Sequence, residues 1–371
     1  MTQALLARPL ALLDLALDRL ATLGRALGYN AEEMRTAASI FERLAVPWGE
    51  HSLAGGPPFG SDITDDHTPF EFSLAIDGAT PELRFLTEAQ AEQPDISSNW
   101  AAALALNEEL ARHFAIDLGR LAVVEDLFAP SGHCPRFALW HAVCLPRGRA
   151  PEFKIYLNPQ AHGKTHASEV VREALARLGF GAASLPVLGP EDELCYFSLD
   201  LSAAPRARVK IYIAHQRATL ARIEAAVSVA CDYQPGRATA FCQAMSDARS
   251  SFEARPVLTC LSFVSGNTRA TSATVHFPVR SYAANDQVVK ERLRSYLSEP
   301  SALLYEQAIE AFAHRPLADH SGIQTYVSLR LQRERDRVTV YLAPELYTAR
   351  TRRLSRPPLL HAVTPAEDAV P

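Results

Sequence analysis

The chain of 371 residues repeats one unit five times: two short strand-like segments beside helical segments. The pairs are FEFSLAI with ELRFLTE (70–76, 82–88), FALWHAVCL with FKIYLNP (137–145, 153–159), CYFSLDL with RVKIYIA (195–201, 208–214), VLTCLSFV with ATVHFPV (257–264, 273–279), and IQTYVSLRL with RVTVYLA (323–331, 337–343). Copies of one supersecondary unit indicate a symmetric architecture. Ten antiparallel strands close most simply into a barrel wrapped by helices, because closure removes exposed edges. We therefore predict an α+β barrel.

Polar residues recur at one position in the second strand of each pair. This column contains Arg84, Lys154, Lys210, Thr274 and Thr339, at steps of 70, 56, 64 and 65 residues. Two residues further on stand Leu86, Tyr156, Tyr212, His276 and Tyr341. The chain has only four lysines, and two of them open the same triplet, Lys-Ile-Tyr.

Alternation along the strands assigns this column to one face. Arg208, Lys210 and Tyr212 share a face of their strand, whereas Val209 and Ile211 lie on the other. The apolar face needs the helices, so the polar column faces the lumen. The lumen is therefore the predicted binding site.

Cations that converge inside a barrel repel one another unless an anion binds between them. Arg84, Lys154, Arg208 and Lys210 thus imply a diphosphate or a carboxylate. Tyrosines interleave with them at Tyr156, Tyr212, Tyr326 and Tyr341, and each aromatic face stabilises a cation by about 0.5–2 kcal/mol. An anion clamp beside an aromatic cage suits ionisation of an allylic diphosphate. Strand tyrosines are also good β-formers and strand-end cations are often solvated, but their recurrence in a lysine-poor chain favours the lumen.

Composition limits the alternatives. A formal net charge of -5 offers no general basic surface for nucleic acid. No apolar run approaches the roughly 18 residues of a membrane helix. The apolar N-terminus carries Asp14 and Arg19 at helical spacing, which suits an amphipathic helix rather than a signal peptide. We expect a cytoplasmic protein that binds neither nucleic acid nor membrane.

We expect a single barrel domain over residues 1–347. Residues 1–50 form N-terminal helices in this reading, with Asn30 as the N-cap of the second, and residues 64–347 form the repeat barrel. Residues 348–371 are basic, then proline-rich, and are expected to form a flexible tail.

The segment DITDD contains Asp62, Asp65 and Asp66, a spacing similar to that of magnesium-binding aspartate motifs. Such motifs lie on helices, whereas this one lies in a Gly- and Pro-rich loop without a second acidic partner motif. We therefore predict a solvated turn and no metal site.

The ordered set TPFEFS, KIYLNP, RVKIYIA, FPVRSY, QTYVSL and VTVYLAP resembles the dimethylallyltryptophan synthase family, the metal-independent indole prenyltransferases of the ABBA barrel type. The resemblance spans roughly residues 64–347. It implies a dimethylallyltransferase of five αββα repeats that needs no cofactor. Its substrates would be dimethylallyl diphosphate and L-tryptophan or a tryptophan derivative, joined by electrophilic aromatic substitution. We expect a monomer or a homodimer.

The resemblance also implies roles for individual residues. Glu71 in TPFEFS accepts the indole N–H. The diphosphate clamp consists of Arg84, Lys154, Arg208 and Lys210, with Gln324 beside it, and Lys154 assists catalysis. The cation shield consists of Tyr156, Tyr212, Tyr326 and Tyr341. Glu71 could instead be an exposed strand carboxylate, but its apolar neighbours Phe70 and Phe72 favour the lumen.

The chain departs from the family pattern in its fourth repeat. Thr274 and His276 stand where the family usually has Lys or Gln followed by Tyr. We expect His276 to belong to the cation shield in place of that tyrosine, and Tyr282 to complete the shield. His141 lies near the place of the family's basic residue, which suggests a general base. A hydrogen-bonded strand histidine without catalytic role is the equal alternative.

Two other functions stay open. One is the same chemistry on a different acceptor, such as a cyclic dipeptide, another indole or a phenol. The other is a non-catalytic barrel that binds an anionic aromatic metabolite.

Overall fold

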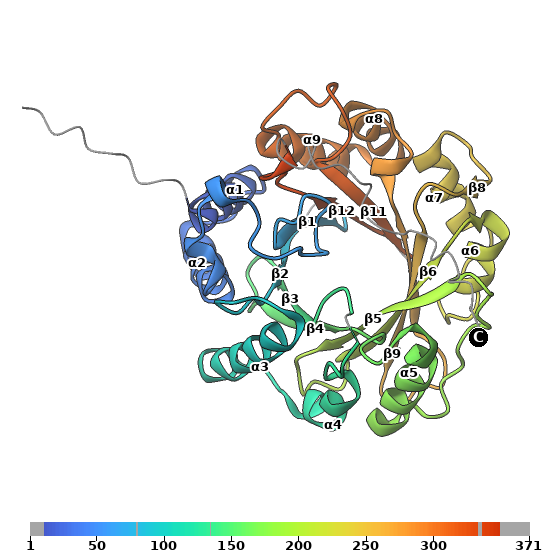
Figure 1. Ribbon diagram of the computed structural model, residues 1–371. Coiled ribbons are helices and arrows are strands. Elements are labelled where there is room, and N and C mark those ends of the chain that lie inside the picture. The colour runs from blue at the N-terminus through green and yellow to red at the C-terminus, as the bar shows by residue number, and fades with distance from the viewer. Residues whose placement is uncertain (1–10, 79–80, 134, 333–335, 349–371) are drawn as a thin grey trace, which may run out of the picture.

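The computed structural model describes residues 11–78, 81–133, 135–332 and 336–348. Within them, ten strands close into a barrel (Figure 1). These are β1 (Phe70–Ile76), β2 (Glu82–Glu88), β3 (Leu139–Leu145), β4 (Glu152–Leu157), β5 (Asp192–Asp200), β6 (Arg208–His215), β9 (Val257–Val264), β10 (Ser272–Phe277), β11 (Gln324–Arg330) and β12 (Arg337–Leu342). All five predicted strand pairs are present.

Every neighbouring pair of barrel strands is antiparallel, in the order β1-β12-β11-β10-β9-β6-β5-β4-β3-β2. The first and last strands close the barrel, with Ser73 opposite Tyr341. Two irregularities occur, one in β5 between Leu194 and Tyr196 and one in β11 between Gln324 and Val327. These bulges reverse which side chains enter the lumen, because one extra residue shifts the alternation.

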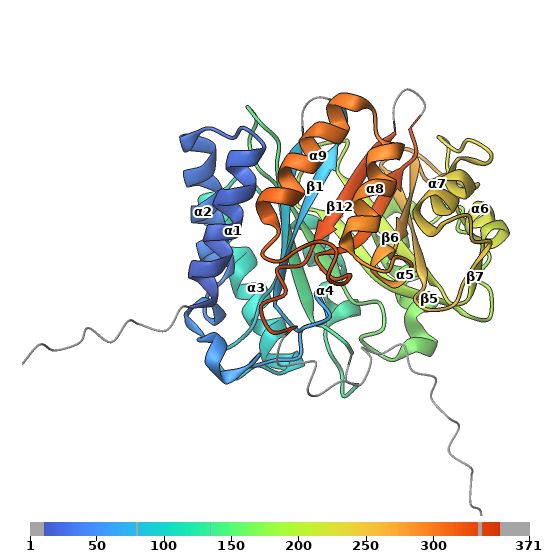
Figure 2. The same ribbon diagram turned by 90° about the horizontal axis from the view of Figure 1, so that it is seen from above.

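Helices surround the barrel (Figure 1). They are α1 (Leu12–Ala26), α2 (Ala31–Leu44), α3 (Ile96–His113), α4 (Gly119–Phe128), α5 (Ala167–Leu175), α6 (Leu220–Val227), α7 (Arg237–Ser246), α8 (Asp286–Tyr296) and α9 (Glu299–Phe312). Each strand pair thus follows a helical segment, which confirms the predicted αββα barrel. In the side view, α1, α2, α8 and α9 run alongside the strands (Figure 2).

The N-cap predicted at Asn30 is present, because its side chain accepts hydrogen bonds from the backbone N–H groups of Glu32 and Glu33, each at 2.9 Å. Short elements connect the repeats: β7 (Ala218–Thr219) pairs with β8 (Ser251–Phe252), and η5 (Val279–Ser281) follows β10. None of the described helices is long and apolar enough to cross a membrane. Apart from Thr348, the predicted tail lies outside the described residues.

The hydrophobic core lies between the barrel and its helices. Phe72 and Phe85 point outward from β1 and β2 and are almost fully buried. Phe41 of α2 packs against both, with ring centroids 6.0 and 5.0 Å away, and Phe312 of α9 covers Phe72 at 6.0 Å. Because apolar side chains fill the outer face, the polar side chains of the same strands must enter the lumen.

Candidate active site

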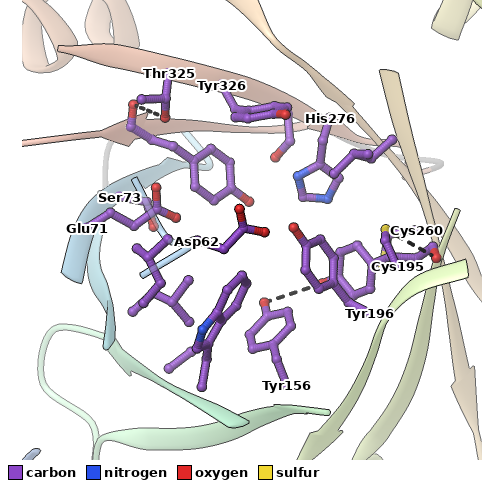
Figure 3. Close-up of a pocket in the computed structure, with 18 of the residues that line it drawn as sticks. Asp62, Glu71, Ser73, Tyr156, Cys195, Tyr196, Cys260, His276, Thr325 and Tyr326 are labelled. Carbon is purple, nitrogen blue, oxygen red and sulfur yellow. Dashed lines mark hydrogen bonds between the residues drawn. The ribbon is translucent and has the colours of Figure 1, made fainter. Parts of the chain in front are cut away.

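The lumen contains a cavity of about 480 Å³ to which all ten barrel strands contribute side chains. The loop of residues 61–67 also lines it. Figure 3 shows side chains from opposite walls of the barrel converging on this space. The structure therefore has a cavity in the lumen, where we predicted the binding site.

Six cationic side chains line one part of the cavity, here called the cation cluster: Arg84, Lys154, Arg208, Lys210, Arg330 and Arg337. Among the described carboxylates, Glu82 and Asp200 neutralise part of this charge. Glu82 Oε1 lies 2.5 Å from Arg84 Nε, and its other oxygen lies 3.0 Å from Arg337 Nη2. Asp200 Oδ2 lies 2.7 Å from Arg208 Nε. The cluster keeps an excess of positive charge.

The pKa values of these groups reflect the field of the cluster. Burial alone would raise the pKa of the Glu82 carboxyl, but Arg84 and Arg337 lower it to about 2. Burial lowers the pKa of Lys210, and the neighbouring Arg208 and Lys154 add to this, so that it falls to about 7. A lowered pKa at a buried lysine reports an unfavourable environment for its charge. A bound anion would relieve it.

Lys210 differs from the other lumen lysine in its contacts. Lys154 Nζ lies 2.9 Å from Cys144 Sγ and donates a hydrogen bond to it. The structure gives the Lys210 ammonium no hydrogen bond or ion pair within the described residues. A half-buried ammonium that has no partner and faces like charges is unfavourable, so this position fits a site that an anionic ligand normally fills.

Next to the cation cluster lies an aromatic belt, which consists of Trp140, Tyr156, Tyr196, Tyr212, His276, Tyr326 and Tyr341. The ring centroids of Tyr212 and Tyr156 are 5.7 Å apart, and that of His276 lies 5.6 Å from Tyr212 and 5.7 Å from Tyr341. Burial raises the pKa of Tyr341 to about 12. The phenols therefore stay neutral, and their faces can stabilise a cation.

Glu71 of β1 lines the cavity on the side opposite His276 (Figure 3). Burial raises the pKa of its carboxyl to about 8, and the nearby Asp65 contributes to this rise. The structure gives this carboxyl no hydrogen-bond partner within the described residues. A ligand N–H would supply one.

The DITDD loop is not the solvated turn that we predicted, because it covers the cavity and is held by ion pairs. Asp65 accepts two hydrogen bonds from Arg255, at 2.5 and 3.2 Å, and lies 2.6 Å from Arg280. Asp62 lies 3.8 Å from Arg136, and both line the cavity. Within the described part of the chain, no group of three or more His, Cys, Asp or Glu side chains could hold a metal ion.

Three predicted residues lie outside the lumen. The first is His141, which points outward from β3; its Nε2 lies 3.0 Å from Asn107 Oδ1 of α3. Burial lowers the pKa of this imidazole to about 3. Trp140 enters the lumen in its place, opposite Tyr156 of β4. The interpretation of His141 as a base in the lumen is wrong.

The second is Gln324, which the bulge in β11 turns outward. Its Nε2 donates to the backbone oxygen of Asp286 at 2.8 Å, and its Oε1 accepts a hydrogen bond from Tyr305. The third is Tyr282, whose hydroxyl donates to the backbone oxygen of Arg255 at 2.9 Å and whose ring packs against Phe252. Neither residue lines the cavity, so they do not belong to the predicted clamp and shield.

The sequence held signals for residues that we missed. Arg337 in RVTVYLA stands two residues before Thr339, just as Arg208 in RVKIYIA stands before Lys210. Arg330 shares its strand face with Ser328 by simple alternation. Tyr196 enters the lumen beside Cys195 because of the bulge in β5, for which the sequence offers no clear signal.

Comparisons with known proteins identify the family of the chain. The family model described as tryptophan dimethylallyltransferase matches residues 14–302. The 6-dimethylallyltryptophan synthase from Micromonospora olivasterospora, solved in complex with DMASPP and Trp, is 34% identical, with a TM-score of 0.85, over 91% of this chain and 98% of that one. The 5-dimethylallyl tryptophan synthase from Streptomyces coelicolor, solved with the same two ligands, is 29% identical, with a TM-score of 0.86, over 96% and 99%.

A more distant structure, AnaPT from Neosartorya fischeri, is 16% identical with a TM-score of 0.74, over 88% of this chain and 91% of that one, and shows the likeness of the fold. The resemblance seen in the ordered strand motifs is thus confirmed over most of the chain. The protein is a member of the tryptophan dimethylallyltransferase family.

Proposed function

We propose that this protein transfers a dimethylallyl group from dimethylallyl diphosphate to the indole ring of L-tryptophan. One observation carries the proposal: a half-buried lysine without a hydrogen bond or ion pair among the described residues, Lys210, lies among five other lumen cations directly beside an aromatic belt. An anionic leaving group and an organic cation must occupy neighbouring places in this reaction. In this cavity the cation cluster can hold the leaving group, and the adjacent aromatic belt can hold the cation.

The cation cluster binds the diphosphate. As the bond between the allylic carbon and the diphosphate oxygen breaks, negative charge grows on the leaving group. Fixed cations then stabilise the transition state more than the ground state, which lowers the barrier. Arg84, Lys154, Arg208 and Lys210 supply this charge in our proposal, with Arg330 and Arg337 completing the cluster. The protein's own cations thus take the part that a metal ion plays in other diphosphate-ionising enzymes.

The aromatic belt holds the dimethylallyl cation. Tyr156, Tyr212 and Tyr341 present neutral rings to it, and their packing excludes water that would capture the cation. The indole ring then attacks the cation with its π electrons, and a carbon–carbon bond forms.

The acceptor binds on the side of Glu71. Its carboxylate accepts the indole N–H, which raises the electron density of the ring and fixes its orientation. Asp62 and Arg136 line the same cavity and offer a carboxylate for the ammonium of an amino acid and a guanidinium for its carboxylate. This pair supports free tryptophan as the acceptor.

The test is to incubate the purified protein with dimethylallyl diphosphate and L-tryptophan in the presence of EDTA and to follow both products. Mass spectrometry is expected to show tryptophan heavier by one dimethylallyl group, with one diphosphate released per product. Parallel reactions contain indole, a tryptophan-containing cyclic dipeptide or a simple phenol. Faster turnover of one of these would contradict the assignment of tryptophan, and absence of diphosphate release with every acceptor would favour a binding protein.

A further inference from the structure

One step of the proposed reaction, the final removal of a proton, has no residue assigned to it so far. After the carbon–carbon bond forms, the ring is a cationic arenium intermediate, and a base must remove the proton from the substituted carbon. The residue predicted for this step, His141, lies outside the barrel wall with its imidazole hydrogen-bonded to Asn107. Trp140 occupies the lumen position next to it and has no basic nitrogen.

A second histidine does lie in the lumen. His276 belongs to β10, opposite Ser328 of β11 and Leu258 of β9, and its imidazole points into the cavity (Figure 3). Its ring lies in the aromatic belt between Tyr212 and Tyr341. The structure gives the imidazole no hydrogen bond within the described residues. A lone pair is therefore available to a ligand at the place that our proposal assigns to the allylic cation.

Resting on this proposed function, we propose that His276 is the general base that restores the aromaticity of the indole. The C–H bond at the newly substituted ring carbon breaks, and its electron pair returns to the ring. The proton moves to the unprotonated imidazole nitrogen of His276. The imidazolium then gives this proton to the departing diphosphate or to water, so that the histidine is neutral again for the next turnover.

The surroundings of His276 keep its imidazole neutral before proton transfer. Burial lowers the pKa of its imidazole to about 3, and the positive charges of Lys210 and Arg84 act in the same direction. The imidazole is therefore neutral before the reaction, as a base must be. A diphosphate bound to those two cations offsets their charge, so the imidazolium is stabilised only when the leaving group is present.

The phenols of the belt and the carboxyl of Glu71 suit the step less well. The neutral phenols of the belt are very weak bases, and burial raises the pKa of Tyr341 to about 12. Glu71 is engaged by the indole N–H in the proposed complex and lies on the opposite side of the cavity from His276 (Figure 3). Our proposal requires that a substrate held by its N–H at Glu71 directs the carbons of its benzo ring toward the wall that carries His276.

The experiment uses L-tryptophan in which deuterium replaces all five ring-carbon hydrogens. The unaltered enzyme is expected to show an isotope effect near unity on turnover, because proton removal is fast. In His276→Tyr, which keeps an aromatic ring in the belt, turnover is expected to fall by about 100-fold or more, since general-base catalysis contributes 10²–10⁴-fold. A primary isotope effect is expected to appear, because proton removal becomes rate-limiting.

A second variant separates the base from the belt. His276→Ala leaves space for free imidazole, and added imidazole is expected to raise its turnover in proportion to the neutral species. The matched control is His141→Ala, which removes a buried strand histidine outside the lumen; imidazole is expected to have no effect there. Thermal unfolding of each variant shows whether it is folded.

The outcomes discriminate between the two proposals. If the unaltered enzyme forms no prenylated tryptophan, the proposed function fails and the role of His276 falls with it. If the unaltered enzyme is active, the inference alone is overturned by either of two results. One is a His276→Tyr variant with turnover within about threefold of normal and no isotope effect. The other is a folded, inactive variant that shows neither an isotope effect nor rescue by imidazole, which would limit His276 to a part of the belt.

Discussion

The phenol oxygens of Tyr156 and Tyr212 lie 3.4 Å apart inside the barrel, although 56 residues separate them in the chain. These are the tyrosines of the two Lys-Ile-Tyr triplets. β5 lies between their strands, and its Ser198 is opposite both Tyr156 and Lys210. The repeated triplet therefore builds one site from two repeats, in which Tyr156 of the first triplet is in register with Lys210 of the second.

We expect the ammonium of Lys210 to support catalysis at the expense of stability. We expect Lys210→Met to lower turnover by roughly 100- to 1000-fold, or about 3–4 kcal/mol, because one fixed charge at the leaving group is lost. The same change is expected to raise the free energy of unfolding by about 1 kcal/mol or more, since a half-buried charge among like charges disappears. Kinetics and chemical denaturation of the ligand-free protein measure the two effects.

The pH dependence of this stability gain has a definite sign. The pKa of Lys210 is lowered in the folded protein from 10.5 to about 7. Its charge therefore costs stability below pH 7, and the cost decreases as the pH rises from 7 to 10.5. The advantage of Lys210→Met should shrink over that range. The matched control, Lys164→Met, removes an exposed lysine; a similar stability gain there would contradict the argument.

Closure of the lumen depends on the ion pairs of Asp65. Asp65→Asn is expected to weaken the contacts with Arg255 and Arg280, which leaves two largely buried guanidinium groups poorly compensated. The loop over the cavity then opens more often and admits water. We expect a larger share of dimethylallyl alcohol relative to prenylated tryptophan, measured by chromatography. The exposed Asp126→Asn is the control, and an unchanged product ratio in Asp65→Asn would count against a sealing role.

The barrel and the centre of its site could be predicted because they follow from local alternation. A strand that reads RVKIYIA has one polar and one apolar face. The apolar face packs against the surrounding helices, so the polar face must line the lumen. Lys154, Tyr156, Lys210 and Tyr212 therefore reached the lumen as expected.

The errors arose where the alternation is interrupted or its phase is undetermined. The bulge in β11 reverses Gln324, so a residue in phase with Tyr326 by sequence points outward in the structure. In β3 each face carries a single polar or aromatic side chain among mostly apolar ones, His141 on one and Trp140 on the other, so only the pairing of Trp140 with Tyr156 decides which side His141 takes. The ion pairs of Asp65 depend on Arg255, 190 residues away, and no local pattern reports such a contact.

The corrected position of Gln324 predicts a structural role. In Gln324→Ala the backbone oxygen of Asp286 and the hydroxyl of Tyr305 lose their partner in a fully buried place. The free energy of unfolding is expected to fall by about 1–3 kcal/mol. The KM for dimethylallyl diphosphate is expected to stay unchanged. A raised KM with normal stability would instead return Gln324 to the diphosphate clamp.

The carboxyl of Glu71 makes the clearest prediction about pH. Burial raises its pKa from 4.5 to about 8 in the folded protein, so the folded state keeps a proton that the unfolded state has lost. The stability that this proton provides is complete below pH 4.5 and is lost as the pH rises to about 8. Glu71→Gln has no such titration, so its stability relative to the unaltered protein should increase between pH 5 and pH 8.

Activity should rise with pH, whereas the stability contributed by the Glu71 proton falls with pH, because only the ionised carboxylate accepts the indole N–H well. The kcat/KM of the unaltered enzyme for tryptophan is expected to rise with pH and to level off above about 8, whereas Glu71→Gln is expected to be slower and to lack this rise. The control, Glu152→Gln, changes an exposed carboxylate at the barrel end. A rise of the same shape in Glu71→Gln would assign the titration to another group, and the role of Glu71 in orienting the indole would have to be abandoned.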